Sequence, residues 1–207
     1  MINFGSVWSK VSAQFAKPSG ILGHVAGLIM ANRESNIQRN KWAVDQLNLK
    51  PSDSVLEIGF GPGLAIQMIC KIVDSGHVYG IDHSDKMLVM AQKRNSLDMK
   101  TGKLTLICGT ISDKHPISNT IDKILDINSF QFWQSPVEDL RKLKDYLKIG
   151  GTVSLVHQPR KPGSTDDDAK SAADHFADLM REAGYQNVQI QTKKMKPVAA
   201  ICVTGTY

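Results

Sequence analysis

Long hydrophobic runs are absent from this sequence of 207 residues: no stretch of about 18 apolar residues occurs, so no segment predicts a membrane-spanning helix. The longest apolar candidate, residues 21–30, is too short and contains a histidine. Cysteine is also scarce. Cys70, Cys108 and Cys202 each lie in an apolar stretch, without a CxxC pattern or a His-rich neighbourhood. We therefore interpret them as buried free thiols of a reducing compartment, and we predict neither a disulfide nor a metal site.

Acidic residues are missing from the N-terminus up to Glu34, whereas Lys10, Lys17 and Arg33 occur there among Ser, Ala and apolar residues. Such a composition is typical of a mitochondrial or other organelle transit peptide, and also of a basic amphipathic helix. Because the turn "KPSG" (17–20) interrupts the segment, we favour a helical cap on a cytoplasmic protein. The net charge of +5 and the pI near 9.1 are compatible with nucleic acid or an anionic membrane surface but indicate neither.

From Pro51 onward, short apolar runs alternate with segments of helical spacing. The predicted strands are 55–58, 78–81, 104–108, 122–128, 152–157, 188–191 and 199–204. The predicted helices are 37–49, 64–73, 84–94, 135–147 with Gly150 and Gly151 as its stop signal, and a last one ending near Glu182. Only "TKKMKP" separates the last two strands, so one of them must run antiparallel. The pattern predicts an α/β fold, a mostly parallel sheet covered on both faces, in a domain of residues 47–207 behind a helical cap of residues 1–46.

The stretch "VLEIGFGPGLAI" (55–66) places Gly59, Gly61 and Gly63 between the first predicted strand and the first predicted helix. Glycines in this turn allow positive φ and a close approach of a ligand at the carboxyl ends of the strands. The dinucleotide pattern would need a third glycine where Leu64 stands, and no Walker loop follows. Glu57, two residues before the first glycine, would repel a pyrophosphate but suits a ligand with an amine and a positive charge. These features point to S-adenosylmethionine.

A second acid, Asp82, ends the next strand, where a carboxylate can accept hydrogen bonds from ribose hydroxyls. "VLEIGFGPG" followed by "VYGIDHSDKML" resembles motifs I and II of the class I, Rossmann-like S-adenosylmethionine-dependent methyltransferases. The chain is most similar to the domains related to ubiquinone and menaquinone C-methylases, from about Leu47 to its end. The resemblance implies seven strands in the order 3-2-1-4-5-7-6 with the last antiparallel. It also implies that Glu57, the three glycines and Asp82 hold the cofactor, with His83 beside the adenine.

One departure concerns the adenine. Many family members place an Asp after the third strand to bind the adenine amino group, and this sequence has "CGTIS" instead, with Thr110 and Ile111 at the corresponding place. The resemblance then implies that the adenine is held by stacking, by backbone groups or by the Thr110 hydroxyl. We also expect a cofactor contact from Asn128, which follows the fourth strand.

Transfer of a methyl group from a sulfonium mainly requires alignment of the reactants, which can lower a barrier by roughly 7–11 kcal/mol, so no catalytic motif is obligatory. A carbon or phenol acceptor would benefit from a base, and His157, at the end of the fifth strand, is the candidate; packing is the alternative role. Phe130, Phe132 and Trp133 could shelter the acceptor or merely pack a helix.

We expect the cap to act as a lid that brings Met30 and Arg33 to the acceptor and makes a weak contact with a membrane surface. The favoured function is methyl transfer to a small molecule. Nucleic-acid transfer is disfavoured because "DINS" is not the Asn/Asp-Pro-Pro-aromatic tetrad and no Pro-Cys occurs. A protein methyltransferase or a non-catalytic domain with the same fold are the alternatives. The sequence leaves open the acceptor, its reacting atom and the oligomeric state.

Overall fold

The computed structural model describes residues 34–117 and 120–207, which form a seven-stranded sheet in the order β3-β2-β1-β4-β5-β7-β6. The strands are β1 (Ser54–Ile58), β2 (His77–Asp82), β3 (Leu104–Cys108), β4 (Ile121–Ile127), β5 (Leu147–His157), β6 (Gln186–Lys193) and β7 (Ala200–Thr206). Neighbouring strands from β3 to β5 run parallel, whereas β7 is antiparallel to both β5 and β6. The predicted order and the antiparallel last strand are therefore confirmed.

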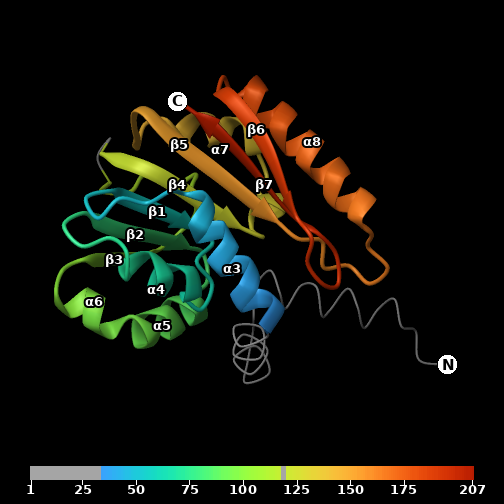
Figure 1. The fold of residues 1–207 in the computed structure, drawn as a ribbon. Coiled ribbons are helices and arrows are strands. Elements are labelled where there is room, and N and C mark those ends of the chain that lie inside the picture. Colours follow the sequence, from blue (N-terminus) through green and yellow to red (C-terminus); the bar gives the residue numbers. More distant parts are fainter. Residues whose placement is uncertain (1–33, 118–119) are drawn as a thin grey trace.

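Helices cover both faces of this sheet (Figure 1). They are α3 (Glu34–Gln46), α4 (Leu64–Cys70), α5 (Asp85–Arg94), α6 (Ser96–Lys100), α7 (Pro136–Leu143) and α8 (Asp166–Glu182), with a 3-10 turn η1 (Phe130–Phe132) after β4. Side chains of α3, α4 and α5 share one buried cluster, and those of α7 and α8 share another. Successive residues of β5 alternate between them: Leu155 belongs to the α7/α8 cluster and Val156 to the α3/α4 cluster.

The cap prediction, residues 1–46, is described only in its last part, the helix α3. Trp42, Ala43 and Val44 of α3 are buried in the same cluster as residues of α4 and β1, so this helix shares the core of the sheet domain. Figure 1 shows α3 lying across the front of the sheet. Met30 and Arg33, the turn at 17–20 and the apolar run at 21–30 lie outside the described residues. Within the described residues, no helix is long and apolar enough to cross a membrane.

Three predicted helices end too late. Those expected at 37–49 and 64–73 end at Gln46 and Cys70, and the one expected at 135–147 ends at Leu143, with β5 beginning at Leu147. Gly150 and Gly151 serve a bulge instead of a helix stop. Ile121 of β4 pairs with Leu147 and Lys123 pairs with Thr152, so the residues between Leu147 and Thr152 bulge out of β5, and Gly150 takes a φ of 81°. Paired glycines suit either role, and the sequence pattern did not separate them. The short helix α6 was not predicted.

Candidate cofactor and acceptor site

The glycine turn after β1 has the backbone geometry that the sequence predicts, with φ of 69°, 51° and 76° at Gly59, Gly61 and Gly63. Two of these glycines allow close packing. A Cβ at Gly59 would collide with the Ser129 side chain, and one at Gly63 would lie 2.8 Å from the Cβ of Ala91. A Cβ at Gly61 would have no described atom within 4 Å. Gly61 therefore faces the open space in which a ligand can approach the turn.

Helix α5 and strand β2 hold this turn in place. Arg94 donates from Nε to the Pro62 carbonyl at 2.9 Å, and Asn95 donates from Nδ2 to the Gly63 carbonyl at 3.1 Å. The Gly59 N–H donates to the Ile81 carbonyl at 2.8 Å. Three hydrogen bonds from or to neighbouring segments therefore fix the backbone of the turn.

Asp82 ends β2 beside the turn, as predicted, and is 6% exposed. Its Oδ2 accepts from the Gly61 N–H at 2.8 Å and its Oδ1 from the Ser84 N–H at 2.9 Å. Burial raises the pKa of Asp82, and these two N–H donors oppose the shift. The half-exposed ring of His83 lies 3.9 Å from Oδ1. Each oxygen keeps a lone pair for a ribose hydroxyl, so the ribose role stays a prediction that the geometry permits.

Glu57 lies beneath the turn, 2% exposed, and its Oε2 has no hydrogen-bond partner among the described residues. Burial raises its pKa well above the usual value, and the neighbouring carboxyl groups of Asp126 and Asp82 raise it further; a backbone bond to Ile66 in the first turn of α4 opposes the shift. A cationic group of a ligand would compensate this crowding of acids. The unpartnered oxygen is the observation that fits a cation at this edge.

Asp126, in β4, was not predicted as a site residue. It is 1% exposed and accepts hydrogen bonds from the N–H groups of Ser129 and Phe130, at 3.1 and 3.0 Å, and from the Ser129 hydroxyl. Burial raises its pKa to about 6. Carboxyl groups at or near the ends of β2, β1 and β4 thus line one edge of the sheet. The acid in "KILDIN" was the available signal, and it was overlooked because no glycine turn follows it.

Asn128 follows β4 with a φ of 58°, and its side chain pairs with the backbone of Gln158. Its Nδ2 donates to the Gln158 carbonyl and its Oδ1 accepts from the Gln158 N–H, both at 2.9 Å. Its own carbonyl accepts from Gln131 Nε2 at 2.8 Å. One amide hydrogen and one lone pair of each oxygen remain unused, so the cofactor contact of Asn128 stays a prediction.

The residues expected near the adenine lie after β3. Thr110 donates from its N–H and its hydroxyl to Oδ2 of Asp113, at 2.7 and 3.0 Å, and these bonds lower the pKa of that exposed carboxyl group. An acid thus stands beside Thr110, although it comes three residues later than the position at which the resemblance would place it. Ile111 is 6% exposed and belongs to the α7/α8 core.

On the acceptor side, Phe130 packs in the core, 3% exposed, with ring centroids 5.0 Å from Trp133 and 4.6 Å from Phe176. Trp133 is half-buried and Phe132 is 55% exposed. His157 ends β5, and the described residues offer no partner to its buried Nδ1. Burial lowers its pKa to about 4, so the ring is neutral near pH 7. With residues of the loop before α8 it lines a hollow of about 310 Å³.

The residues at this edge fit S-adenosylmethionine, because Gly61 is open to it, Glu57 has an unpartnered buried oxygen for a cation and Asp82 can meet hydroxyls. Among the described residues no group of His, Cys, Asp and Glu could hold a metal ion. The chain matches the family model described as a methyltransferase domain over residues 55–151.

Relatives of the chain are methyltransferases as well. It is 31% identical to the uncharacterized methyltransferase YdaC of Bacillus subtilis over 181 residues, which cover 87% of this chain and 97% of YdaC. It is 28% identical to a phosphoethanolamine N-methyltransferase of Triticum aestivum, over 75% of this chain but only 29% of that protein.

Solved structures share the fold. A SAM-dependent methyltransferase of Aquifex aeolicus superposes with a TM-score of 0.65 at 20% identity, over 80% of this chain and 88% of that one. A Haemonchus contortus phosphoethanolamine N-methyltransferase 2, solved in complex with S-adenosyl-L-methionine, gives a TM-score of 0.61 at 17% identity, over 75% and 38%. These comparisons do not single out the ubiquinone and menaquinone branch. The chain belongs to the class I S-adenosylmethionine-dependent methyltransferases.

Proposed function

We propose that this methyltransferase acts on a small-molecule acceptor that binds at the carboxyl ends of β4 and β5. The observation that carries the proposal is the hollow of about 310 Å³ beside His157, a volume at the lower end of those that take small organic ligands. It lies at the same edge of the sheet as the glycine turn. Lys161, Ser164 and Asp168 supply polar groups to its lining, and such groups fix the orientation of a small ligand.

The cofactor-side residues have separable tasks in this proposal. The bound cofactor supplies an activated methyl group on its sulfonium. Gly61 gives its adenosyl part room, Asp82 accepts from its ribose hydroxyls, and Glu57 with Asp126 provides negative charge beneath its cationic end. The chain then aligns the two reactants and excludes water, and this positioning is where most of the rate gain arises.

His157 is the candidate for contact with the acceptor. A neutral ring whose pKa is lowered to about 4 is a weak base, so removal of a proton from a phenol is not its best role. Its ring lines the hollow and can exchange a hydrogen bond with an acceptor hydroxyl or amine. We therefore assign it the orientation of the acceptor, with proton removal as the alternative. The lid role of residues 1–46, their weak membrane contact and a cytoplasmic location belong to the same proposal.

The names of some relatives support a small acceptor. Phosphoethanolamine N-methyltransferase and 2-methyl-6-phytyl-1,4-hydroquinone methyltransferase are named for small molecules, whereas malonyl-[acyl-carrier protein] O-methyltransferase is named for an acceptor carried on a protein. The chain spans about a third of the length of each of these relatives, so their acceptors are not transferred to it.

The test is to incubate the chain with methyl-labelled S-adenosylmethionine and, separately, with a small-molecule extract, a protein fraction, nucleic acid and lipid vesicles. We expect label only in the small-molecule extract, and only with a folded wild-type chain. The Gly61→Val variant is the control for contaminating activity. Label confined to protein or nucleic acid would contradict the proposed acceptor class while leaving the family assignment intact.

A further inference from the structure

Arg39 of α3 is a buried cation without a matching acid. It is 5% exposed, and no other Lys or Arg of the described residues is as completely buried. None of the ion pairs in the described part of the chain includes it. Residues 1–33 contain no Asp or Glu that could supply a partner. A buried charge is costly unless a counter-charge meets it, so a ligand is the remaining source of one.

The guanidinium is held in one orientation by neutral groups. Nη1 donates to Oε1 of Gln158 at 3.1 Å, and Nη2 donates to Oδ1 of Asn36. Gln158 cannot turn its amide, because Nε2 donates to the Val198 carbonyl at 2.7 Å and to the Lys196 carbonyl at 3.4 Å. Nε of Arg39 is buried, and no described group accepts from it. One N–H is therefore fixed in place without a partner.

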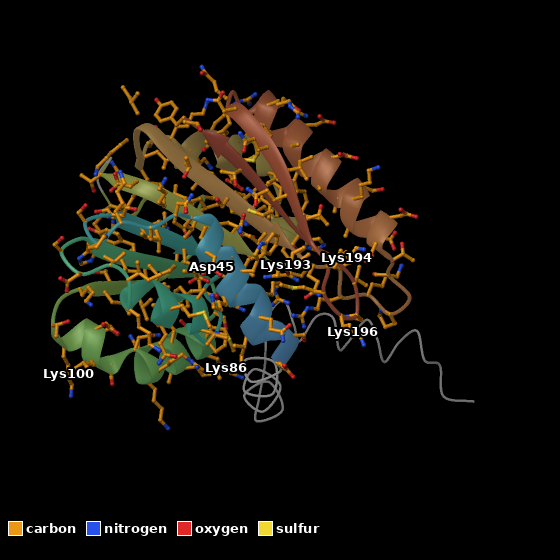
Figure 2. The ribbon with its side chains drawn as sticks, in the orientation of Figure 1. Asp45, Lys86, Lys100, Lys193, Lys194 and Lys196 are labelled. Atoms are coloured by element: carbon orange, nitrogen blue, oxygen red, sulfur yellow. The ribbon has the colours of Figure 1, made fainter. Side chains whose placement is uncertain are left out.

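This cation lies at the edge of the sheet where the ligands bind. Gln158 directly follows His157 at the end of β5, and its backbone pairs with the Asn128 side chain after β4. Figure 2 shows Lys193, Lys194 and Lys196 at the turn between β6 and β7, on the same side of the molecule as the lower half of α3. These lysines are exposed, so they add a positive field at the rim and Arg39 supplies the buried contact.

The charges of the reactants favour such a cation. S-adenosylmethionine carries a carboxylate besides its two positive groups. Glu57, Asp82 and Asp126 on the cofactor side are acids, so they offer this carboxylate no positive charge. A planar guanidinium with free donors matches a carboxylate or a phosphate, and its charge-assisted bonds are stronger than those of a neutral donor.

We propose that Arg39 is the anion-binding residue of this site and that it binds an oxyanion, either the carboxylate of the cofactor or a carboxylate or phosphate of the acceptor. Binding of the cofactor carboxylate follows from the family assignment, whereas binding of an acceptor oxyanion rests on the proposed function. Both possibilities place the same ion pair at Arg39. The experiment distinguishes them by which ligand loses affinity.

The test is calorimetry on the full chain with four proteins: wild type, Arg39→Met, Asn36→Asp and the control Lys41→Met. Lys41 lies on the same helix but is exposed and pairs with Asp45, so its substitution removes a charge without touching the site. Asn36→Asp keeps the guanidinium and places a competing carboxylate against it. The probes are S-adenosylhomocysteine, 5′-methylthioadenosine, which lacks the carboxylate, and inorganic phosphate added to the S-adenosylhomocysteine complex.

If the cofactor supplies the oxyanion, Arg39→Met and Asn36→Asp weaken S-adenosylhomocysteine binding by about tenfold or more, and 5′-methylthioadenosine binding does not change. If the acceptor supplies it, S-adenosylhomocysteine binding is unchanged and the phosphate binding seen in wild type is lost in both variants. Lys41→Met behaves as wild type in either case. Absence of any label transfer with normal S-adenosylhomocysteine binding would count against the proposed function and not against Arg39.

Melting temperatures distinguish a ligand role from a purely structural one. Asn36→Asp places a carboxylate beside the buried Arg39 guanidinium, so the melting temperature of this variant should rise while its affinity for the oxyanion falls. If Arg39 has only a structural role, the melting temperature should rise without a loss of affinity. Unchanged binding of both S-adenosylhomocysteine and phosphate in folded Asn36→Asp would overturn the proposal, even if Arg39→Met failed to fold.

Discussion

Asp126 gives a prediction whose size can be worked out from the structure. Its carboxyl group is buried, and burial raises its pKa from the usual value of 3.8 to about 6. Ionised Asp126 is therefore disfavoured in the folded chain relative to the unfolded chain. At about 1.4 kcal/mol for each pKa unit, the ligand-free protein loses about 3 kcal/mol of stability when this group ionises.

The sign follows from the direction of the shift. Because the folded pKa lies above the unfolded value, the stabilisation by this group is complete below about pH 3.8 and is lost as the pH rises through about 6. The amide introduced by Asp126→Asn does not titrate. Its oxygen can keep the two N–H bonds from Ser129 and Phe130, and the Ser129 hydroxyl can turn toward the Ile58 carbonyl, 3.3 Å away. Asp126→Asn should therefore become more stable relative to wild type as the pH rises.

The measurement is urea unfolding of both proteins, without ligand, at several values from about pH 4 to about pH 8. We expect the difference in unfolding free energy to change by about 2.5 kcal/mol over this range. The change should be larger if the substitution also removes a negative charge that raises the pKa of Glu57. Any constant cost of the substitution cancels, because only the slope is used. Asp122→Asn is the contrasting control: Lys148 and the Ser54 N–H outweigh burial and lower the pKa of Asp122, so its removal should cost stability at neutral pH. A difference for Asp126→Asn that stays constant within about 0.5 kcal/mol would refute the reasoning.

Four further outcomes follow from the site. Gly61→Val should abolish cofactor binding. Gly102→Val is the control: Gly102 has a similar positive φ and equally open surroundings but lies outside the glycine turn, so the substitution should cost the same roughly 1–2 kcal/mol of strain and leave binding intact. Equal cofactor binding by the two variants would contradict the role of Gly61. Asp82→Ala should weaken the binding of S-adenosylmethionine by about tenfold or more, since it removes a hydrogen-bond acceptor for the ribose and the carboxylate that holds the Gly61 N–H. Calorimetry measures this affinity, and an unchanged value would show that Asp82 does not bind the ribose. Burial lowers the pKa of His157 to about 4, so the free energy of unfolding of the wild type should fall as the pH drops from 6.5 toward 4. The His157→Asn variant should lose less over this range, and an equal loss would show that the ring does not titrate in this way. Deletion of residues 1–33, which spares the core helix α3, should abolish methyl transfer but not cofactor binding, and full transfer to an identified acceptor would exclude a lid.

The glycine turn and the acids at the ends of β1 and β2 could be predicted because their signals are local. Gly59, Gly61 and Gly63 lie within a few residues of Glu57, and the strand and helix on either side follow from periodicity alone. The order of the strands was available only through the resemblance, since no single segment encodes which strands pair.

The missed residues act through distant partners. Arg39 and Gln158 are 119 positions apart, and nothing in the pattern of α3 distinguishes a buried arginine from a solvated one. Asp126 matters because it lies beside Glu57 in the sheet, with Leu125 as the register partner of Glu57. Phe130 shows the opposite case: a strand-end aromatic residue was a candidate for the acceptor, and the structure places its ring against Trp133 and Phe176. Burial decides these cases, and burial depends on the whole fold.

The side chain of Gln158 has a consequence for the order in which the chain assembles during synthesis. Helix α3 leaves the ribosome early, yet the polar partner of Arg39 follows 119 residues later, and the carbonyls that orient that partner come a further 38 and 40 residues on. Until then the guanidinium has no fixed acceptor at Gln158 and gains by staying in water. Contacts of such long sequence separation close slowly, and domains of this size can pass through incomplete intermediates. The Arg39 guanidinium is therefore expected to reach its final setting only when the C-terminal hairpin of β6 and β7 has been made, although the apolar face of α3 can pack on α4 earlier.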